Sequence, residues 1–131
     1  PTTVVVDHMG RPDVRQPVDG PEFERFVRLM REHDNIWSKV SCPERLSVGG
    51  PPALHGEQAA YRDVVPFACR IVETFPDRVL WGTDWPHPNL KDHMPDDGLL
   101  VDFIPHIAVT LELQTNLLVT NPMRLYWPEE A

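Results

Sequence analysis

The sequence predicts an α/β fold in which parallel strands alternate with helices. Three short runs, at residues 3–6, 36–41 and 78–82, have the length and residue types of strands. Two stretches with helical periodicity, at 21–33 and 57–75, lie between them. Because helical connections imply parallel pairing and right-handed crossovers, we expect about three βα units. Three strands cannot close a barrel, but they suit a segment of a (β/α)₈ barrel, which usually has about 250 residues.

The composition is that of one modest domain and excludes several classes of protein. The chain has 131 residues and a formal net charge of −8, which argues against a nucleic-acid partner or a basic membrane surface. Two cysteines, Cys42 and Cys69, are too few for a disulfide framework, so a reduced, cytoplasmic setting is expected. The chain opens at Pro1 without an initiator Met. We therefore expect residues 1–131 to be the C-terminal part of a single, longer domain.

The first βα unit occupies roughly the first third of the chain. Thr3–Val6 is apolar or β-branched throughout, so we expect a strand buried on both faces. Gly10 permits a sharp turn and Pro12 prevents the strand from continuing. A helix should begin at Pro21 and end near His33, because apolar residues recur at helical spacing between them. These residues are Phe23, Phe26, Val27 and Met30.

The second unit contains a more polar strand and a long helix. The strand at 36–41 is ended by Cys42 and the proline after it. No helix start is evident behind Cys42, so nothing indicates a lowered thiol pKa. Residues 47–56 are too rich in glycine and proline for regular structure. The helix at 57–75 contains Pro66, which should kink it.

The third strand, at 78–82, is followed by a proline-rich loop and then by helices. The first of these should start near Asp97, although Pro105 obscures its end. Thr110 can cap the next helix, and Asn121 with its following proline gives a second cap-and-start signal.

A polar side chain follows each of the three predicted strands. They are His8, Arg45 and Asp84. Because the carboxyl ends of parallel strands share one edge of a sheet, we expect these side chains to converge, where they could polarise a carbonyl, bind a carboxylate and activate water. Simpler readings remain open: Asp84 could accept loop N–H bonds, His8 could be structural, and Arg45 could be a surface charge.

Two other residues, Arg11 and His87, are weaker candidates for the same site. Metal binding is an alternative role for His8 and Asp84. Arg11 could pair with Asp13 or touch a ligand, and His87, held between two prolines, could line the site. His8 and Asp84 could both bind a metal, but a catalytic zinc normally needs three protein ligands. No His-x-His pair occurs, so the sequence shows no complete metal site.

Five segments carry a resemblance to a known family. They are residues 5–13, 42–46, 80–89, 95–99 and 121–127. In this order they resemble the C-terminal part of the 2-pyrone-4,6-dicarboxylate lactonases, a family of the amidohydrolase superfamily. The Gly-Thr-Asp-Trp-Pro segment alone would indicate only a wider branch of that superfamily.

The resemblance implies a fold, a reaction and a set of site residues. The strands would be the sixth, seventh and eighth of a (β/α)₈ barrel. The reaction would be hydrolysis of the pyrone lactone to 4-oxalomesaconate or its enol tautomer, in the breakdown of lignin-derived aromatic compounds. By the resemblance, Asp84 would be the general base on water, His8 would polarise the lactone carbonyl, and Arg45 would contact a carboxylate of the small dicarboxylate substrate. From their positions in the chain, Arg11 and His87 are further candidates for contact with that substrate. The family uses no metal or other cofactor, and its first five strands lie outside this sequence.

Two rival hypotheses remain at this stage. The chain could belong to a metal-dependent hydratase or decarboxylase of the same superfamily. It could also be an inactive, truncated scaffold that associates into a homo-oligomer through an exposed edge strand at Val4–Val6.

Overall fold

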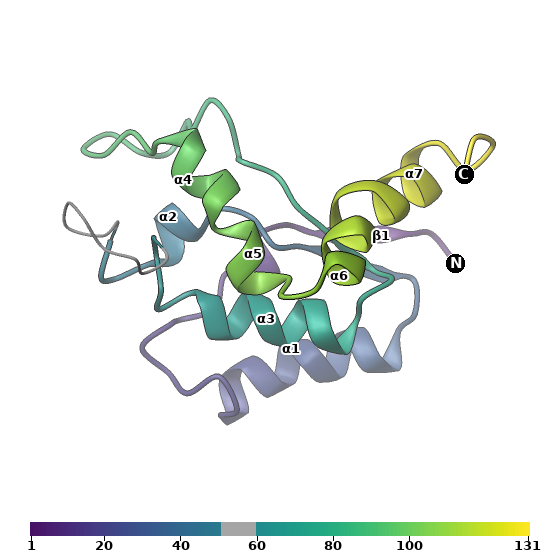
Figure 1. Ribbon diagram of the computed structural model, residues 1–131. Coiled ribbons are helices and arrows are strands. Elements are labelled where there is room, and N and C mark those ends of the chain that lie inside the picture. Colours follow the sequence, from purple (N-terminus) through teal and green to yellow (C-terminus); the bar gives the residue numbers. More distant parts are fainter. Residues whose placement is uncertain (51–59) are drawn as a thin grey trace.

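The computed structural model describes residues 1–50 and 60–131, which contain a three-stranded parallel sheet (Figure 1). Its strands are β1 (Val4–Val6), β2 (Ile36–Lys39) and β3 (Val79–Leu80). β2 lies in the middle and pairs in parallel with both of the others. The predicted α/β class is therefore confirmed, and the carboxyl ends of the three strands share one edge.

Burial differs sharply between the central strand and the first strand. The two central residues of β2 are buried, as are both residues of β3. In β1, Val4 is 45% exposed and the two following valines are half-buried. The expectation that this strand is buried on both faces is wrong, because β1 is an edge strand with one neighbour within the described residues. The second and third strands also end before the predicted positions 41 and 82.

Short helical turns follow the first two strands. The turn η1 (Asp7–Gly10) follows β1, and Gly10 has a φ of +69° as its predicted turn requires. A Cβ at Gly10 would lie 3.2 Å from the ring of Phe26. The one-turn helix α2 (Pro43–Leu46) begins directly after Cys42, where no helix start was evident from the sequence. Pro43 favours a helix start at this position, because its fixed φ suits the first helical residue and its missing N–H would have no partner there.

The two longer helices are the crossover connections and lie side by side along the sheet (Figure 1). Helix α1 (Pro21–Glu32) has the predicted bounds and buries the predicted apolar face. The rings of Phe23 on α1 and Phe67 on α3 (Val65–Thr74) meet edge to face, with centroids 5.0 Å apart. This contact closes the core between the helices.

Helix α3 begins later than predicted. Its first residue is Val65, and Pro66 lies in its first turn, where the missing N–H costs nothing. Pro66 therefore starts the helix and does not kink it. The earlier part of the predicted helix, at 57–59, and most of the predicted loop before it lie outside the described residues.

The segment predicted as one helix after Asp97 forms two. Helix α4 (Asp97–Asp102) begins after Asp96, whose side chain accepts a hydrogen bond from the Gly98 N–H at 2.8 Å. Helix α5 (Ile104–Ile107) has Pro105 in its first turn. Pro105 thus separates two short helices, again because proline is tolerated only where a helix begins.

The C-terminal helical layer consists of three consecutive helical segments. They are α6 (Leu111–Thr115), the π-helical turn η2 (Asn116–Thr120) and α7 (Asn121–Tyr126). The predicted cap is confirmed, because the Thr110 hydroxyl accepts a hydrogen bond from the Leu113 N–H at 3.1 Å. Figure 1 places α7 and both chain termini at the opposite side of the molecule from α2.

Asn121 has a different role from the predicted cap. It is helical, with a φ of −68°, and its side chain makes no cap hydrogen bond. Its buried amide donates to the carbonyl oxygens of Pro76 at 2.7 Å and Val79 at 2.9 Å. Asn121 therefore ties the helical layer to β3.

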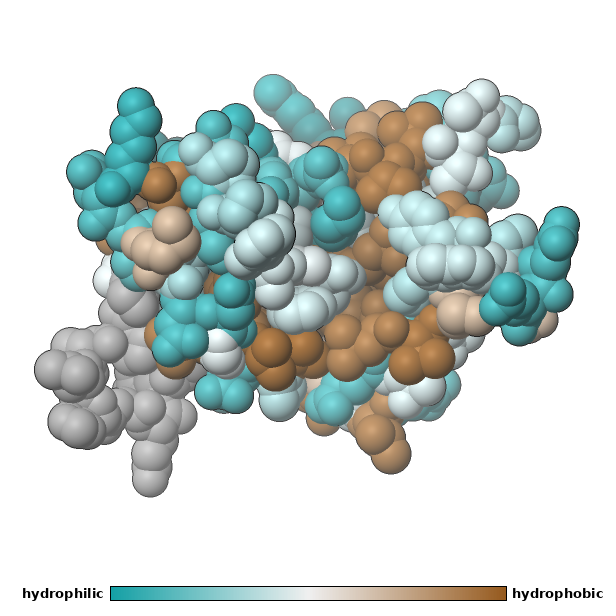
Figure 2. All heavy atoms as spheres, turned by 90° about the horizontal axis from the view of Figure 1, so that it is seen from above, coloured by the Kyte–Doolittle hydropathy of each residue, from teal (hydrophilic) through white to brown (hydrophobic). Residues whose placement is uncertain are grey.

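The surface of the segment from α4 to η2 includes apolar side chains. Figure 2 shows apolar surface gathered across the middle of the face seen there, with polar surface around it. Exposed large apolar residues between α4 and η2 are Val101, Val109, Leu111, Leu118 and Val119.

Among the described residues, no helix has the length and hydrophobicity needed to span a membrane.

Candidate active site

The sheet edge predicted to carry the site has a sharp turn after each strand. His8 follows β1, Cys42 follows β2 and Asp84 follows β3, and their φ angles are 55°, 61° and 62°. Non-glycine residues are uncommon in this left-handed region, and such residues concentrate at functional sites. The turns aim the three side chains at one point, where the ligand atoms of all three lie within 4.8 Å of one another.

The carboxylate of Asp84 is the centre of this cluster. One oxygen lies 3.8 Å from Nε2 of His8, and the other lies 3.9 Å from Nη1 of Arg45. The predicted convergence of His8, Arg45 and Asp84 is therefore present in the structure. The Asp84 side chain is 24% exposed, so water can still reach its oxygens. Ser41 orients the histidine, since its hydroxyl lies 2.7 Å from His8 Nδ1.

Arg45 also lines an open hollow beside the cluster. This hollow has a volume of about 350 Å³ and is lined by Arg11, Pro12, Asp13, Arg15, Glu22, Arg45, Leu46, Ser47 and Val48. Asp13 pairs with Arg15 at 2.8 Å, so the suggested pairing of Asp13 with Arg11 is wrong. Arg11 has no ion pair with another residue of the described ranges. Arg11 and Arg45 are thus placed to attract an anionic ligand into the hollow.

His87 lies elsewhere than predicted. It is 2% exposed and is absent from the lining of the hollow beside Arg45. Its Nδ1 faces Glu44 at 3.3 Å and its Nε2 faces Asp97 at 2.9 Å. The prediction that His87 contacts substrate is therefore corrected, because these two carboxylates hold the ring in the protein interior.

Cys42 and Glu44 were missed as parts of the site. Cys42 Sγ lies 3.3 Å from Asp84 and 3.5 Å from Glu44. A helix does start behind Cys42, contrary to the sequence reading. Burial and the neighbouring carboxylates nevertheless raise the pKa of the Cys42 thiol, which disfavours the thiolate form that a nucleophile needs. Its position directly after a predicted strand was the available signal, but Asp84 is 42 residues away in the chain.

A metal could be held by His8, Cys42 and Asp84. Imidazole nitrogen, thiolate sulfur and carboxylate oxygen are all zinc ligands, and three protein ligands are the usual number in catalytic sites. The sequence reading found only two of these three groups. The donor set in the described residues therefore fits a zinc-like ion, provided that the Cys42 thiol loses its proton on binding.

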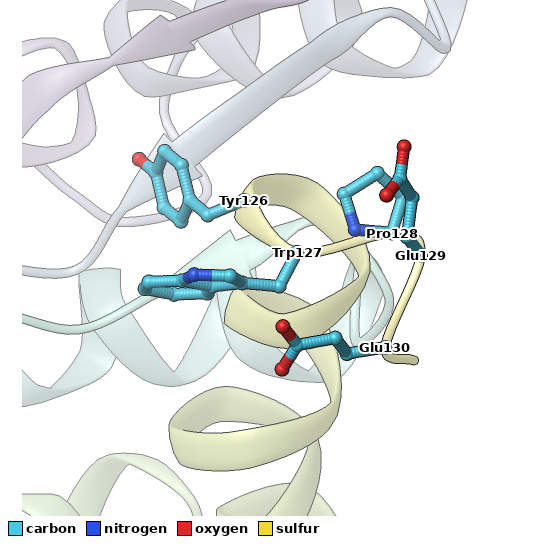
Figure 3. Close-up of a pocket in the computed structure, with 5 residues that line it drawn as sticks. All are labelled: Tyr126, Trp127, Pro128, Glu129 and Glu130. Carbon is cyan, nitrogen blue, oxygen red and sulfur yellow. The ribbon is translucent and has the colours of Figure 1, made fainter.

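A second hollow lies at the end of α7, away from the sheet edge that carries Asp84 (Figures 1 and 3). It is lined by Tyr126, Trp127, Pro128, Glu129 and Glu130. None of the predicted site residues contributes to it, and the ionisable residues of its lining are one tyrosine and two glutamates. It is therefore poorly suited to a dicarboxylate.

Comparison with known proteins shows which family the chain matches and which relatives it resembles. The amidohydrolase family model matches residues 1–127. The chain is 82% identical over 131 residues to a 2-pyrone-4,6-dicarboxylate hydrolase of Comamonas testosteroni, with 100% of this chain and 43% of that protein covered. It is 40% identical over 124 residues to a 4-sulfomuconolactone hydrolase of Hydrogenophaga intermedia, with 93% and 38% covered. An apo crystal structure from Agrobacterium tumefaciens superposes with a TM-score of 0.75 at 28% identity, with 95% and 42% covered. The chain thus spans about two fifths of the length of these relatives.

Proposed function

Because this chain belongs to the amidohydrolase family, we propose that it carries catalytic residues of a hydrolase acting on 2-pyrone-4,6-dicarboxylate. The observation that carries the proposal is the placement of the Asp84 carboxylate between His8 and Arg45. The 82% identity to a hydrolase named for this substrate supports the choice of lactone. The product would be 4-oxalomesaconate or its enol tautomer.

The chemistry follows from the position of each group. Asp84 accepts a proton from water while the water oxygen attacks the lactone carbonyl. His8 donates a hydrogen bond from Nε2 to the developing oxyanion, with Ser41 holding the ring through Nδ1. The ring C–O bond then breaks, and Asp84 returns the proton to the departing enolate oxygen. This closes the proton balance without any further reactant.

Two arginines are placed to bind the negatively charged carboxylates of the substrate. Arg45 lies both beside Asp84 and on the wall of the hollow, so its planar guanidinium can bind a carboxylate of the substrate next to the attacking water. Arg11, on the same hollow, can meet a second carboxylate.

The proposal extends to the setting of the site. β1, β2 and β3 are assigned as the sixth, seventh and eighth strands of a (β/α)₈ barrel, which is consistent with partial coverage of longer relatives. Residues 1–131 would then be the C-terminal part of one domain. A reduced, cytoplasmic location and a role in the breakdown of lignin-derived aromatics remain part of the proposal.

The test uses the protein as its gene encodes it, with whatever residues flank this segment. Purified protein is incubated with 2-pyrone-4,6-dicarboxylate, and loss of the pyrone ultraviolet absorbance is followed. Asp84→Asn should lower kcat by about 10²–10⁴-fold, the usual contribution of a general base. The matched control is Asp19→Asn, since Asp19 is exposed and makes no ion pair within the described ranges. Near-normal turnover of Asp84→Asn would overturn the assignment of the base.

A metal-dependent hydratase or decarboxylase is the second candidate, and the His8, Cys42 and Asp84 cluster favours it. When bound, a divalent ion would polarise a substrate oxygen or lower the pKa of a bound water. Metal analysis of the purified protein, followed by chelation, decides between the candidates. Stoichiometric zinc whose removal abolishes activity would support this second candidate and reject the metal-free reaction.

A further inference from the structure

A buried contact joins the two segments that carry the proposed base and the proposed carboxylate-binding arginine. Glu44 directly precedes Arg45 in α2, and His87 follows Asp84 by three residues. Glu44 Oε1 and His87 Nδ1 lie 3.3 Å apart, and both side chains are almost fully buried. A shift of either side chain would therefore be transmitted to Asp84 or Arg45.

The polar atoms of this contact have few other partners. Glu44 Oε2 and His87 Nδ1 are buried without a hydrogen-bond partner in the described part of the chain. His87 Nε2 faces Asp97, whose side chain is 47% exposed. Because buried charges are unfavourable unless paired, Glu44 needs cationic or proton-donating neighbours, and in the described part of the chain the His87 ring and the Cys42 thiol both lie beside it. Each ring nitrogen of His87 thus faces one carboxylate: Nδ1 faces Glu44 and Nε2 faces Asp97.

Backbone and side-chain contacts lead from this pair to the base. The His87 N–H donates to the Asp84 carbonyl at 2.7 Å, which closes the turn after the carboxylate. Both residues have left-handed backbone angles, with φ of 61° and 62°, so this turn needs contacts that hold it in place. Cys42 Sγ lies between the carboxylates of Glu44 and Asp84 and fills the space behind the base.

We infer that His87, clamped between Glu44 and Asp97, is a positioning residue that sets the placement of Asp84 relative to Arg45. The inference rests on the proposed function for its kinetic consequence. It assigns His87 no contact with substrate. Removing the clamp should displace the base and the arginine relative to each other, and a displacement of about 1 Å can cost about 10²-fold in rate.

The test compares four variants of the protein as its gene encodes it: His87→Gln, Glu44→Gln, Asp97→Asn and the control His33→Gln. His33 is exposed at the end of α1. His87→Gln and Glu44→Gln should each lower kcat for the pyrone dicarboxylate by about 10–100-fold and raise KM, because base and arginine are both displaced. Asp97→Asn should have a smaller effect, and His33→Gln should have none. If His87→Gln does not fold, Glu44→Gln carries the same test at nearly unchanged volume.

A second measurement separates positioning from a merely structural role. Proton NMR of the wild-type protein should show slowly exchanging downfield imidazole N–H signals that persist in His33→Gln and are lost in His87→Gln. Absence of these signals in the wild type would overturn the clamp. An unchanged KM, with kcat falling only as the folded fraction falls, would overturn the positioning role. If the wild type does not hydrolyse the pyrone at all, the proposed function fails, and the NMR signals alone decide whether the clamp exists.

Discussion

The buried amide of Asn121 offers a test of how the helical layer holds the strand that leads to Asp84. In a strand, successive carbonyls point to opposite sides. The Arg78 carbonyl accepts a hydrogen bond from Ser38 in β2, and the Leu80 carbonyl accepts one from Val40, directly after β2. The Val79 carbonyl therefore points to the opposite side of β3, away from β2. The side-chain amide of Asn121 donates one hydrogen bond to the Val79 carbonyl and a second to the Pro76 carbonyl. Asn121→Ala removes both.

The expected loss of stability follows from the burial of the two carbonyls. A buried acceptor left without a partner costs about 1–3 kcal/mol. The Val79 bond is buried and should cost that full amount, whereas the Pro76 bond is only partly buried and its carbonyl can recover a water. Adding about 1 kcal/mol for the lost Pro76 hydrogen bond gives a sum of about 2–4 kcal/mol. With a urea m-value of about 2 kcal/mol/M, the unfolding midpoint should fall by about 1–2 M at unchanged m.

Urea unfolding followed by circular dichroism measures this shift. Asn89→Ala is the matched control, because Asn89 is exposed. Asn121→Asp should be at least as damaging, since a carboxylate would face two carbonyl oxygens. A midpoint for Asn121→Ala equal to that of the wild type would show that these two hydrogen bonds do not stabilise the fold.

Three further predictions concern the turn, the loop and the sheet edge. Gly10→Ala should destabilise the fold by about 1–2 kcal/mol, the cost of the left-handed region for an alanine, with the Phe26 ring adding crowding; urea midpoints measure it. Burial works to raise the pKa of Asp63, but hydrogen bonds from 47–49 outweigh it and hold that pKa below 3.8. The stabilisation by ionised Asp63 is present above pH 3.8, the unfolded pKa, and is lost as pH falls through the lower folded pKa. Urea unfolding midpoints measured from pH 6 to pH 3 should therefore fall less steeply with decreasing pH in Asp63→Asn than in the wild type. If the edge strand drives self-association, light scattering should show a homo-oligomer that Val4→Lys weakens; a wild-type monomer would count against the scaffold hypothesis.

Prolines and an asparagine show where local sequence signals were insufficient. Pro66 and Pro105 lay within continuous apolar patterns, so the sequence predicted a kinked helix around Pro66 and a single helix containing Pro105. In the structure each proline lies in the first turn of a helix, a position that depends on where the preceding backbone turns. Asn121 looked like a cap, yet its amide bonds to carbonyls more than 40 residues away.

The order of elements, the parallel sheet and the placement of His8, Arg45 and Asp84 at strand ends could all be predicted from the sequence. Those features depend on local periodicity and on chain breakers, which neighbouring residues specify. The positions of Cys42 and Glu44 in the cluster, and the burial of His87, became evident from the folded arrangement alone. These contacts depend on left-handed backbone turns and on pairs of groups about 40 residues apart, and no local pattern encodes the distance between such groups.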